Sequence, residues 1–93
     1  MAKRYDNAWD AIYDDDPARA ESLKIKSELM IRIEKFIKGN GLIQKEAARL
    51  LGVSQPRISD LVRGKFDRFT IDMLINMLSR VGIKVDVRIK KAA

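Results

Sequence analysis

Residues 44–65 read QKEAARLLGVSQPRISDLVRGK, and this stretch decides how the rest of the chain can fold. Its apolar residues recur at spacings of three and four on both sides of Gly52, which predicts two short helices joined by a tight turn. Two helices that cross steeply need a small residue where their backbones approach each other, and Ala48 has the right position for it. Gly52 can adopt the positive φ that such a turn requires without steric cost. The apolar residues expected to hold the two helices together are Ala47, Leu51, Val53, Ile58 and Leu61.

The polar residues of the second helix have side chains suited to base edges. If Ile58 and Leu61 face inward, the N-terminal end of this helix is free to enter a major groove. Glutamine can make two hydrogen bonds to adenine, arginine can bind O6 and N7 of guanine, and serine can bind a base or the backbone. The residues expected to read bases are therefore Gln55, Arg57 and Ser59.

Phosphate contacts are expected on either side of these base contacts. Gln44 stands at the positive end of the first helix, where an anion is favoured, although it could equally serve only as a helix start. Lys45 lies next to it. Arg63 and Lys65 follow the second helix and could bind the backbone, or could simply be solvated charges.

The spacing of this motif resembles that of a known family. Counted from Gln44, the small residue is fifth, the glycine ninth, and apolar residues are fourth, eighth, tenth, fifteenth and eighteenth. This pattern resembles the helix-turn-helix of DNA-binding repressors in the XRE superfamily, the superfamily of Cro and the phage C-repressors. The resemblance implies a mainly α, lambda-repressor-like bundle of four to five helices. A plain helical hairpin would explain the apolar spacing but not Ala48 and Gly52.

Composition restricts the chemistry that the chain can perform. It has 93 residues, 46% hydrophobic and 34% charged, a balance typical of one small globular domain. It contains neither cysteine nor histidine, which excludes disulfides, thiolate zinc sites and the commonest general base. No nucleophile has an adjacent base, so we expect no enzyme activity, no cofactor and no metal. No apolar run could span a membrane and the N-terminus lacks a signal-peptide core, so we expect a cytoplasmic, nucleoid-associated protein.

The charge of the chain is unevenly distributed. The net charge is +6, from 19 Lys+Arg against 13 Asp+Glu. Lys3 and Arg4 against five aspartates give residues 1–16 a charge of −3, which leaves +9 on residues 17–93. A basic body attracts nucleic acid through its phosphates, although the same charge could serve solubility alone.

Two further helices are expected on either side of the motif. Asp16 and Pro17 are typical of a helix start, and the glycines after Lys38 end that helix. Its inward residues are expected to be Ile25, Leu29, Ile33, Phe36 and Ile37. The second helix of the motif should begin after Ser54 and a last helix after Thr70, since both hydroxyls can cap the amides that follow. The last helix should end at Gly82, with Ile71, Leu74, Ile75 and Leu78 facing inward.

The period changes at the C-terminus. Residues 83–90, IKVDVRIK, alternate strictly between apolar and charged residues, which predicts a β-strand with one apolar face. The apolar residues, expected to mediate dimerisation, are Ile83, Val85, Val87 and Ile89. A single strand needs a partner, either residues 5–13 of the same chain or the same strand of a second copy. We favour the second copy, because a twofold pair would place two recognition helices about one DNA turn apart.

The order of segments extends the resemblance to nearly the whole chain. An acidic, aromatic leader (NAWDAIYDD), the segment KGNGLIQKEAARLLGVSQPRISDLVRGK, the segment FDRFTIDMLINMLSRVG and the closing IKVDVRIK resemble the small HigA-like antitoxins of the XRE family. The resemblance implies a homodimeric repressor that binds a palindromic operator in double-stranded DNA and neutralises a co-encoded RelE-type toxin. It also implies that Gln44, Gln55, Arg57 and Ser59 carry DNA recognition.

The chain is therefore expected to have three parts: an acidic aromatic leader (1–16), a helix-turn-helix DNA-binding domain (17–82) and a dimerisation strand (83–90). Two other functions stay open. One is a protein-interaction module, a toxin neutraliser with only non-specific affinity for DNA. The other is a standalone XRE-type regulator without a toxin. The leader, with Trp9 at its centre, could bind a basic partner or pack on its own domain.

Overall fold

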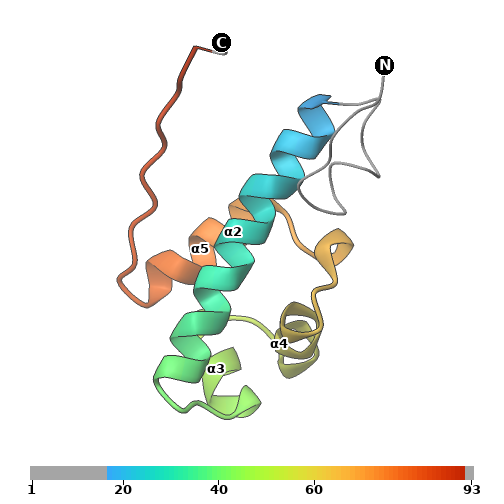
Figure 1. Cartoon of the computed structure of the whole chain (residues 1–93). Helices are drawn as coiled ribbons and strands as arrows, with labels where there is room; N and C mark the ends of the chain where they lie inside the picture. The colour runs from blue at the N-terminus through green and yellow to red at the C-terminus, as the bar shows by residue number, and fades with distance from the viewer. Residues whose placement is uncertain (1–16, 92–93) are drawn as a thin grey trace.

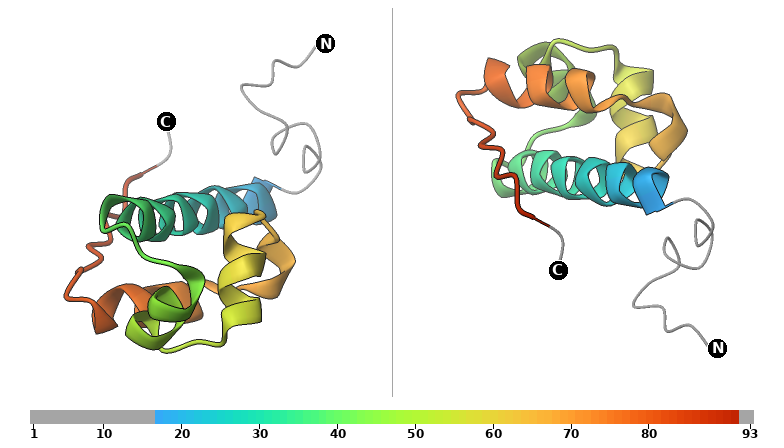
Figure 2. Two further views of the ribbon diagram at one scale, coloured as in Figure 1. Left: turned by 90° about the horizontal axis from the view of Figure 1, so that it is seen from below. Right: turned by 90° about the horizontal axis from the view of Figure 1, so that it is seen from above.

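A computed structural model describes residues 17–91. These residues form four α-helices and one short 3₁₀-helix, η1 (Figure 1). The elements, in chain order, are α2 (Pro17–Gly39), α3 (Gln44–Leu51), α4 (Gln55–Val62), η1 (Phe66–Arg68) and α5 (Ile71–Arg80). The long α2 lies on one side, and α3, α4 and α5 lie together on the other (Figure 2). The expected mainly α bundle is confirmed, whereas residues 1–16, with the leader and the Asp16 cap, lie outside the described part.

The helix boundaries follow the local signals in the sequence. The Ser54 hydroxyl accepts a hydrogen bond from the Arg57 amide at 3.3 Å, and the Thr70 hydroxyl accepts one from the Met73 amide at 3.2 Å. Both side chains therefore satisfy a backbone donor that a helix start leaves without a partner. At the end of α2, Gly41 has a φ of 60°, and the Leu42 amide donates to the Ile37 carbonyl at 3.0 Å. The cap positions predicted for α4 and α5 are confirmed.

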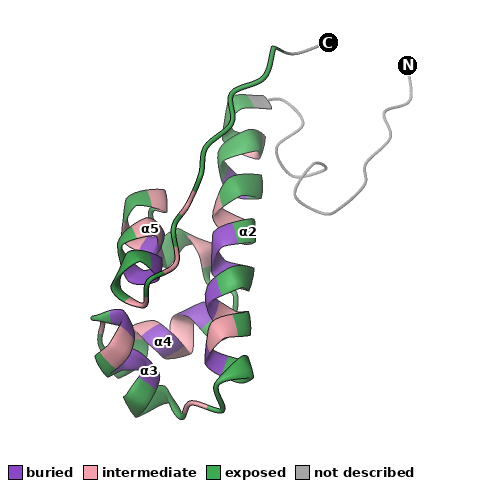
Figure 3. Cartoon of the chain, turned by 90° about the vertical axis from the view of Figure 1, so that its left-hand side faces the viewer, coloured by how far each residue is buried: buried purple, intermediate pink, exposed green. Residues whose placement is uncertain are grey.

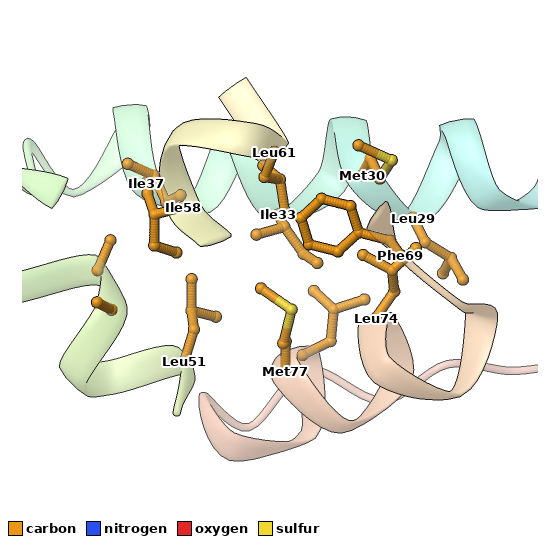
Figure 4. Packing of buried hydrophobic residues seen from close by; sticks show 13 residues of the cluster. Leu29, Met30, Ile33, Ile37, Leu51, Ile58, Leu61, Phe69, Leu74 and Met77 are labelled. Atoms are coloured by element: carbon orange, nitrogen blue, oxygen red, sulfur yellow. The ribbon is translucent and has the colours of Figure 1, made fainter. Parts of the chain in front are cut away.

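One apolar core connects all four α-helices (Figure 4). Ile33 of α2, Ile58 of α4 and Leu74 of α5 are completely buried in it. Phe69 also points into this core, although it lies in the connection between η1 and α5 and not on a helix. The full set of buried core residues is Leu29, Met30, Ile33, Ile37, Ala47, Ala48, Leu51, Ile58, Leu61, Phe69, Leu74, Met77 and Leu78.

The inward face of α2 differs from the predicted one at its N-terminal end. Leu29, Ile33 and Ile37 are buried as expected, but Ile25 is 42% exposed. Leu23 and Met30 are buried in addition. The reason is that Leu23 and Met30 lie on the side of α2 that faces the bundle, whereas Ile25 lies about 200° around the helix from Leu23.

The predicted C-terminal strand is not formed. Residues 81–91, which follow α5, run without helix or strand pairing in the described part of the chain (Figure 3). Ile83 and Val85 pack partly against the core, whereas Val87 and Ile89 are 76% and 93% exposed. A strand requires a neighbouring strand to accept its hydrogen bonds, and residues 17–91 contain none. The first two apolar residues of the segment therefore contact the domain, and the last two are exposed to solvent.

None of the helices in the described residues is long and apolar enough to cross a membrane.

Candidate nucleic-acid interface

The turn between α3 and α4 has the geometry that the sequence predicts. Gly52 has a φ of 72°, and the Val53 amide donates to the Ala48 carbonyl at 3.0 Å. Ala48 is buried where the two helices meet. A Cβ on Gly52 would lie 2.6 Å from Cδ of Arg80, so the α5 side chain lies directly over the turn. Gly52 is thus required for its backbone angle, and a Cβ there would also displace the side chain of Arg80.

Helix α4 buries one side and exposes the other. Ile58 and Leu61 are almost completely inaccessible to solvent. On the other side Gln55 and Arg63 are exposed and Ser59 is half-buried. Because Gln55 is the first residue of α4, its side chain projects from the helix end that can enter a major groove. The predicted base-reading residues Gln55 and Ser59 are thus accessible from outside the bundle.

Arg57 makes contacts that the sequence does not predict. It is half-buried, and its Nη1 donates a hydrogen bond to the Arg68 carbonyl at 2.8 Å. Its guanidinium carbon lies 5.7 Å from the centre of the Phe69 ring, within the range of a cation–π interaction. Arg57 therefore connects α4 to the segment between η1 and α5. A guanidinium has five N–H donors, so most of its hydrogen-bonding capacity is still available.

The start of α3 presents a second group of polar side chains. Gln44, Lys45 and Glu46 are all exposed there. The Glu46 carboxylate accepts a hydrogen bond from the Ile43 amide at 3.1 Å, which directs its charge back to the helix start. Gln44 is the first residue of α3, and its side chain can approach a phosphate beside the groove.

Basic residues also follow α4 directly. Arg63 and Lys65 are exposed on either side of Gly64, which has a φ of 70°. Asp60 could in principle neutralise Arg57 or Arg63, but within residues 17–91 it forms no ion pair with either. The cations at this end of α4 are therefore available to an external anion. The described residues also contain no cluster of three or more side chains that could hold a metal ion.

The predicted site residues fall into three groups along the α3–α4 pair. Gln44 and Lys45 lie at the start of α3, while Arg63 and Lys65 lie past the end of α4. Between them α4 carries Gln55, Arg57 and Ser59. The contacts of Arg57 could not be predicted from the sequence, because the hydrogen-bond acceptor is the backbone carbonyl of Arg68 and the ring belongs to Phe69, a loop residue.

The buried crossing at Ala48, the turn at Gly52 and the exposed start of α4 define a helix-turn-helix DNA-binding protein. A family model described as a helix-turn-helix domain (HTH_37) matches residues 12–90, and the chain belongs to this family. No curated protein compared with the chain matches it. Membership of the family implies DNA binding in transcriptional regulation, and domains of this kind are typically not enzymes. The helix-turn-helix part of the predicted XRE resemblance is confirmed, and the HigA-like identity stays a prediction.

Proposed function

We propose that the protein is a sequence-specific transcriptional repressor that binds a palindromic operator as a homodimer. The observation that carries the proposal is the exposed N-terminal end of α4, where Gln55 projects from a helix whose opposite side is buried through Ile58 and Leu61. A helix fixed in this way can enter a major groove as a rigid unit. The charge of +9 on residues 17–93 favours the approach to DNA.

In this proposal Gln55 and Ser59 contact base edges. Gln44 and Lys45 bind phosphates on one side of the groove, and Arg63 and Lys65 bind phosphates on the other. Arg57 contacts guanine or the backbone with the N–H groups that it does not donate to Arg68. The major groove is about 12 Å wide, and eight residues of helix are about 12 Å long, so α4 can reach from one border to the other.

Dimerisation is proposed to use the apolar side of the C-terminal segment. Val87 and Ile89 are largely exposed, and the segment from residue 83 is not helical and makes no strand in the described chain. Antiparallel pairing with the same segment of a second copy would cover both side chains and satisfy the backbone groups. A twofold dimer would then bind half-sites centred about 34 Å apart.

The finer proposal is that the protein is the antitoxin of a type II toxin–antitoxin pair. It is supported by the order of segments, in which the acidic, aromatic residues 5–16 precede a small DNA-binding domain. An acidic and aromatic segment suits a basic partner such as a RelE-type, mRNA-cleaving toxin. The antitoxin would repress its own operon and bind the toxin through the leader. A standalone regulator would lack the second activity.

Selection of bound duplexes from a random pool, followed by footprinting of the enriched sequence, tests the repressor proposal. We expect an inverted repeat with half-sites about one helical turn apart, and a preference for it that persists at high salt. The logarithm of the affinity should fall linearly with the logarithm of salt concentration, with a slope of about 0.9 for each phosphate contact.

Gln55→Ala provides the residue-specific arm of this experiment, with Arg63→Ala as the matched control. Loss of a base contact should cost about 1–3 kcal/mol and relax the preference at one position in each half-site. Arg63→Ala should weaken all duplexes alike and reduce the salt slope. Enrichment of no sequence, or an equal loss on every duplex for Gln55→Ala, would contradict base reading by α4.

A further inference from the structure

A cavity of about 370 Å³ lies outside the helix-turn-helix, between the N-terminal half of α2 and the connection from α4 to η1. None of the residues contributed by α2 belongs to the site described above. The lining residues are Arg19, Ser22, Leu23 and Lys26 from α2, Gly64 and Lys65 from the connection, and Phe66 and Asp67 from η1.

The rim of this cavity is basic. Three of its residues, Arg19, Lys26 and Lys65, carry a positive charge, and one, Asp67, carries a negative charge. Asp67 is a weak competitor for an external anion, because its side chain is 85% exposed and its carboxylate lies 4.0 Å from Nε of Arg68. Within residues 17–91 neither Lys26 nor Lys65 forms an ion pair. An anion that enters the cavity would therefore meet net positive charge.

Lys26 holds a defined position at this rim. It is half-buried, and its ammonium group donates a hydrogen bond to the Phe66 carbonyl at 3.1 Å. This bond joins α2 to the connection that follows α4. An ammonium has three N–H donors, so two of them can still bind a ligand. Because part of the side chain is already ordered, binding costs less conformational entropy than it would for a fully mobile lysine.

The interior of the cavity is partly apolar. Leu23 is buried and Phe66 is half-buried, and both line the cavity. A ligand that suits this arrangement combines an anionic group with an uncharged carbon surface. The DNA backbone has both, since each phosphate is followed by a deoxyribose ring.

The cavity is also in the right place relative to α4. Lys65 lies three residues beyond Val62, the last residue of α4, and contributes to the cavity. The connection around η1 lies on the same side of α2 as α4 (Figure 1). With α4 across a groove of about 12 Å, the end of α4 is next to the phosphate strand that borders the groove. A backbone that continued along this strand past Lys65 would meet the cavity.

We propose that this cavity binds the sugar–phosphate backbone that flanks the recognition groove, with Lys26 as the backbone ligand on α2. The inference rests on the proposed function, because it takes α4 as the helix that enters the groove. It adds to the interface a helix that lies outside the helix-turn-helix. The contribution is independent of sequence, since phosphate and sugar carry no base information.

The test compares Lys26→Gln with Lys24→Gln in the full chain. Both variants remove one positive charge from α2, but Lys24 is exposed, does not line the cavity, and lies about 200° around the helix from Lys26. Any loss of long-range attraction is thus common to both. Affinity is measured against salt concentration on the selected operator and on a random duplex of equal length, and thermal unfolding confirms that both variants fold.

We expect Lys26→Gln to bind both duplexes several-fold more weakly than Lys24→Gln, with a salt slope smaller by about 0.9. Lys26→Arg keeps the charge and the donors, so it should retain the slope. Removal of the base pairs that flank the half-sites should abolish the difference in affinity between Lys26→Gln and Lys24→Gln, because the flanking backbone is then absent.

Equal slopes for the two glutamine variants would overturn the proposal. So would a Lys26→Gln effect confined to the operator, because this would indicate base reading and not backbone binding. If Lys26→Gln instead loses an acidic protein partner while its slope matches the control, the cavity is a peptide site and the proposal is wrong. Failure of the proposed function has a different result, because the unmodified protein would then show no preference for any operator. The salt slopes of the two glutamine variants on random duplex would still test the cavity.

Discussion

Gly52 combines two requirements in one residue. Its φ of 72° is unfavourable for any residue with a Cβ, and its missing side chain leaves room for Arg80 of α5. The contact with Arg80 involves the flexible end of a long side chain, which can move away. The backbone angle cannot change without opening the turn between α3 and α4. The dominant cost of a substitution therefore comes from the backbone.

We expect Gly52→Ala to lower the free energy of unfolding by about 1–2 kcal/mol, because alanine is strained in the left-handed region. Gly39→Ala is the matched control, since Gly39 ends α2 at an ordinary φ and has open space around its Cβ position. There alanine should be neutral or stabilising. Urea unfolding of both variants checks the prediction, and an equal effect of the two substitutions would contradict it.

Arg57 is expected to affect both stability and DNA binding. Arg57→Ala removes a hydrogen bond to the Arg68 carbonyl and the contact with Phe69, which together should cost about 1 kcal/mol of unfolding free energy. It should also weaken operator binding by more than this loss of stability explains, because the proposed contacts of Arg57 with DNA are lost as well. Arg63→Ala, at the opposite end of α4 and exposed, should leave stability unchanged.

The measurements are urea unfolding and titration of folded protein with operator duplex. If Arg57→Ala changes stability but binds the operator as the unmodified protein does, Arg57 has a purely structural role. If it changes neither, the two contacts contribute nothing measurable.

At the scale of single residues, the sequence correctly predicts the positions that follow a local rule of spacing or helix capping. Ala48, Gly52, Ser54 and Thr70 were each predicted from a fixed offset or from the chemistry of a cap, and the structure confirms all four. Phe69 was not predicted, because a loop residue follows no period. Arg57 was expected to face outward, because helical periodicity predicts the direction in which a side chain leaves its helix. Periodicity does not predict which hydrogen-bond acceptors the side chain contacts there.

At the scale of elements, all the expected helices are present and the strand is absent. A helix satisfies its backbone hydrogen bonds internally, so local periodicity and caps are enough to predict it. A strand depends on a partner that need not be near in sequence. The alternation in residues 83–90 therefore indicates which side is apolar, but not what covers it. The dimer, which would supply the partner, stays a proposal.

Replacement of the two exposed apolar residues tests this proposal. Val87→Ser with Ile89→Ser should leave the domain folded, because both side chains are largely in solvent, but should shift the protein toward monomers. A matched control is Lys84→Ser with Asp86→Ser, which changes the charged side of the same segment. Sedimentation analysis should show a dimer for the control and a monomer for the test variant, with operator affinity reduced in parallel. A monomeric unmodified protein, or a dimeric test variant, would contradict pairing through these residues.

At the scale of the whole molecule, the predicted division into leader, domain and strand separates two activities. The proposed base-reading and phosphate-binding residues of the helix-turn-helix lie on α3, on α4 and directly after α4, all within the described part. A protein partner, by contrast, is proposed to bind the leader. The two activities should therefore be separable by deletion, if charge is kept constant.

Deletion of residues 1–13 meets this condition. Lys3 and Arg4 balance Asp6 and Asp10, so the net charge stays at +6, and the three aspartates before Pro17 are kept in the sequence. We expect the shortened protein to bind operator with unchanged affinity and salt slope, because the net charge and all the charged residues of the helical domain are retained. If the protein is an antitoxin, it should no longer bind or neutralise a co-encoded toxin, because Trp9 and both tyrosines are removed. Co-expression with the neighbouring reading frame, scored by growth and by co-purification, measures the second activity. Loss of DNA binding would contradict the independence of the helix-turn-helix, whereas retained neutralisation would place the partner site on the helical domain.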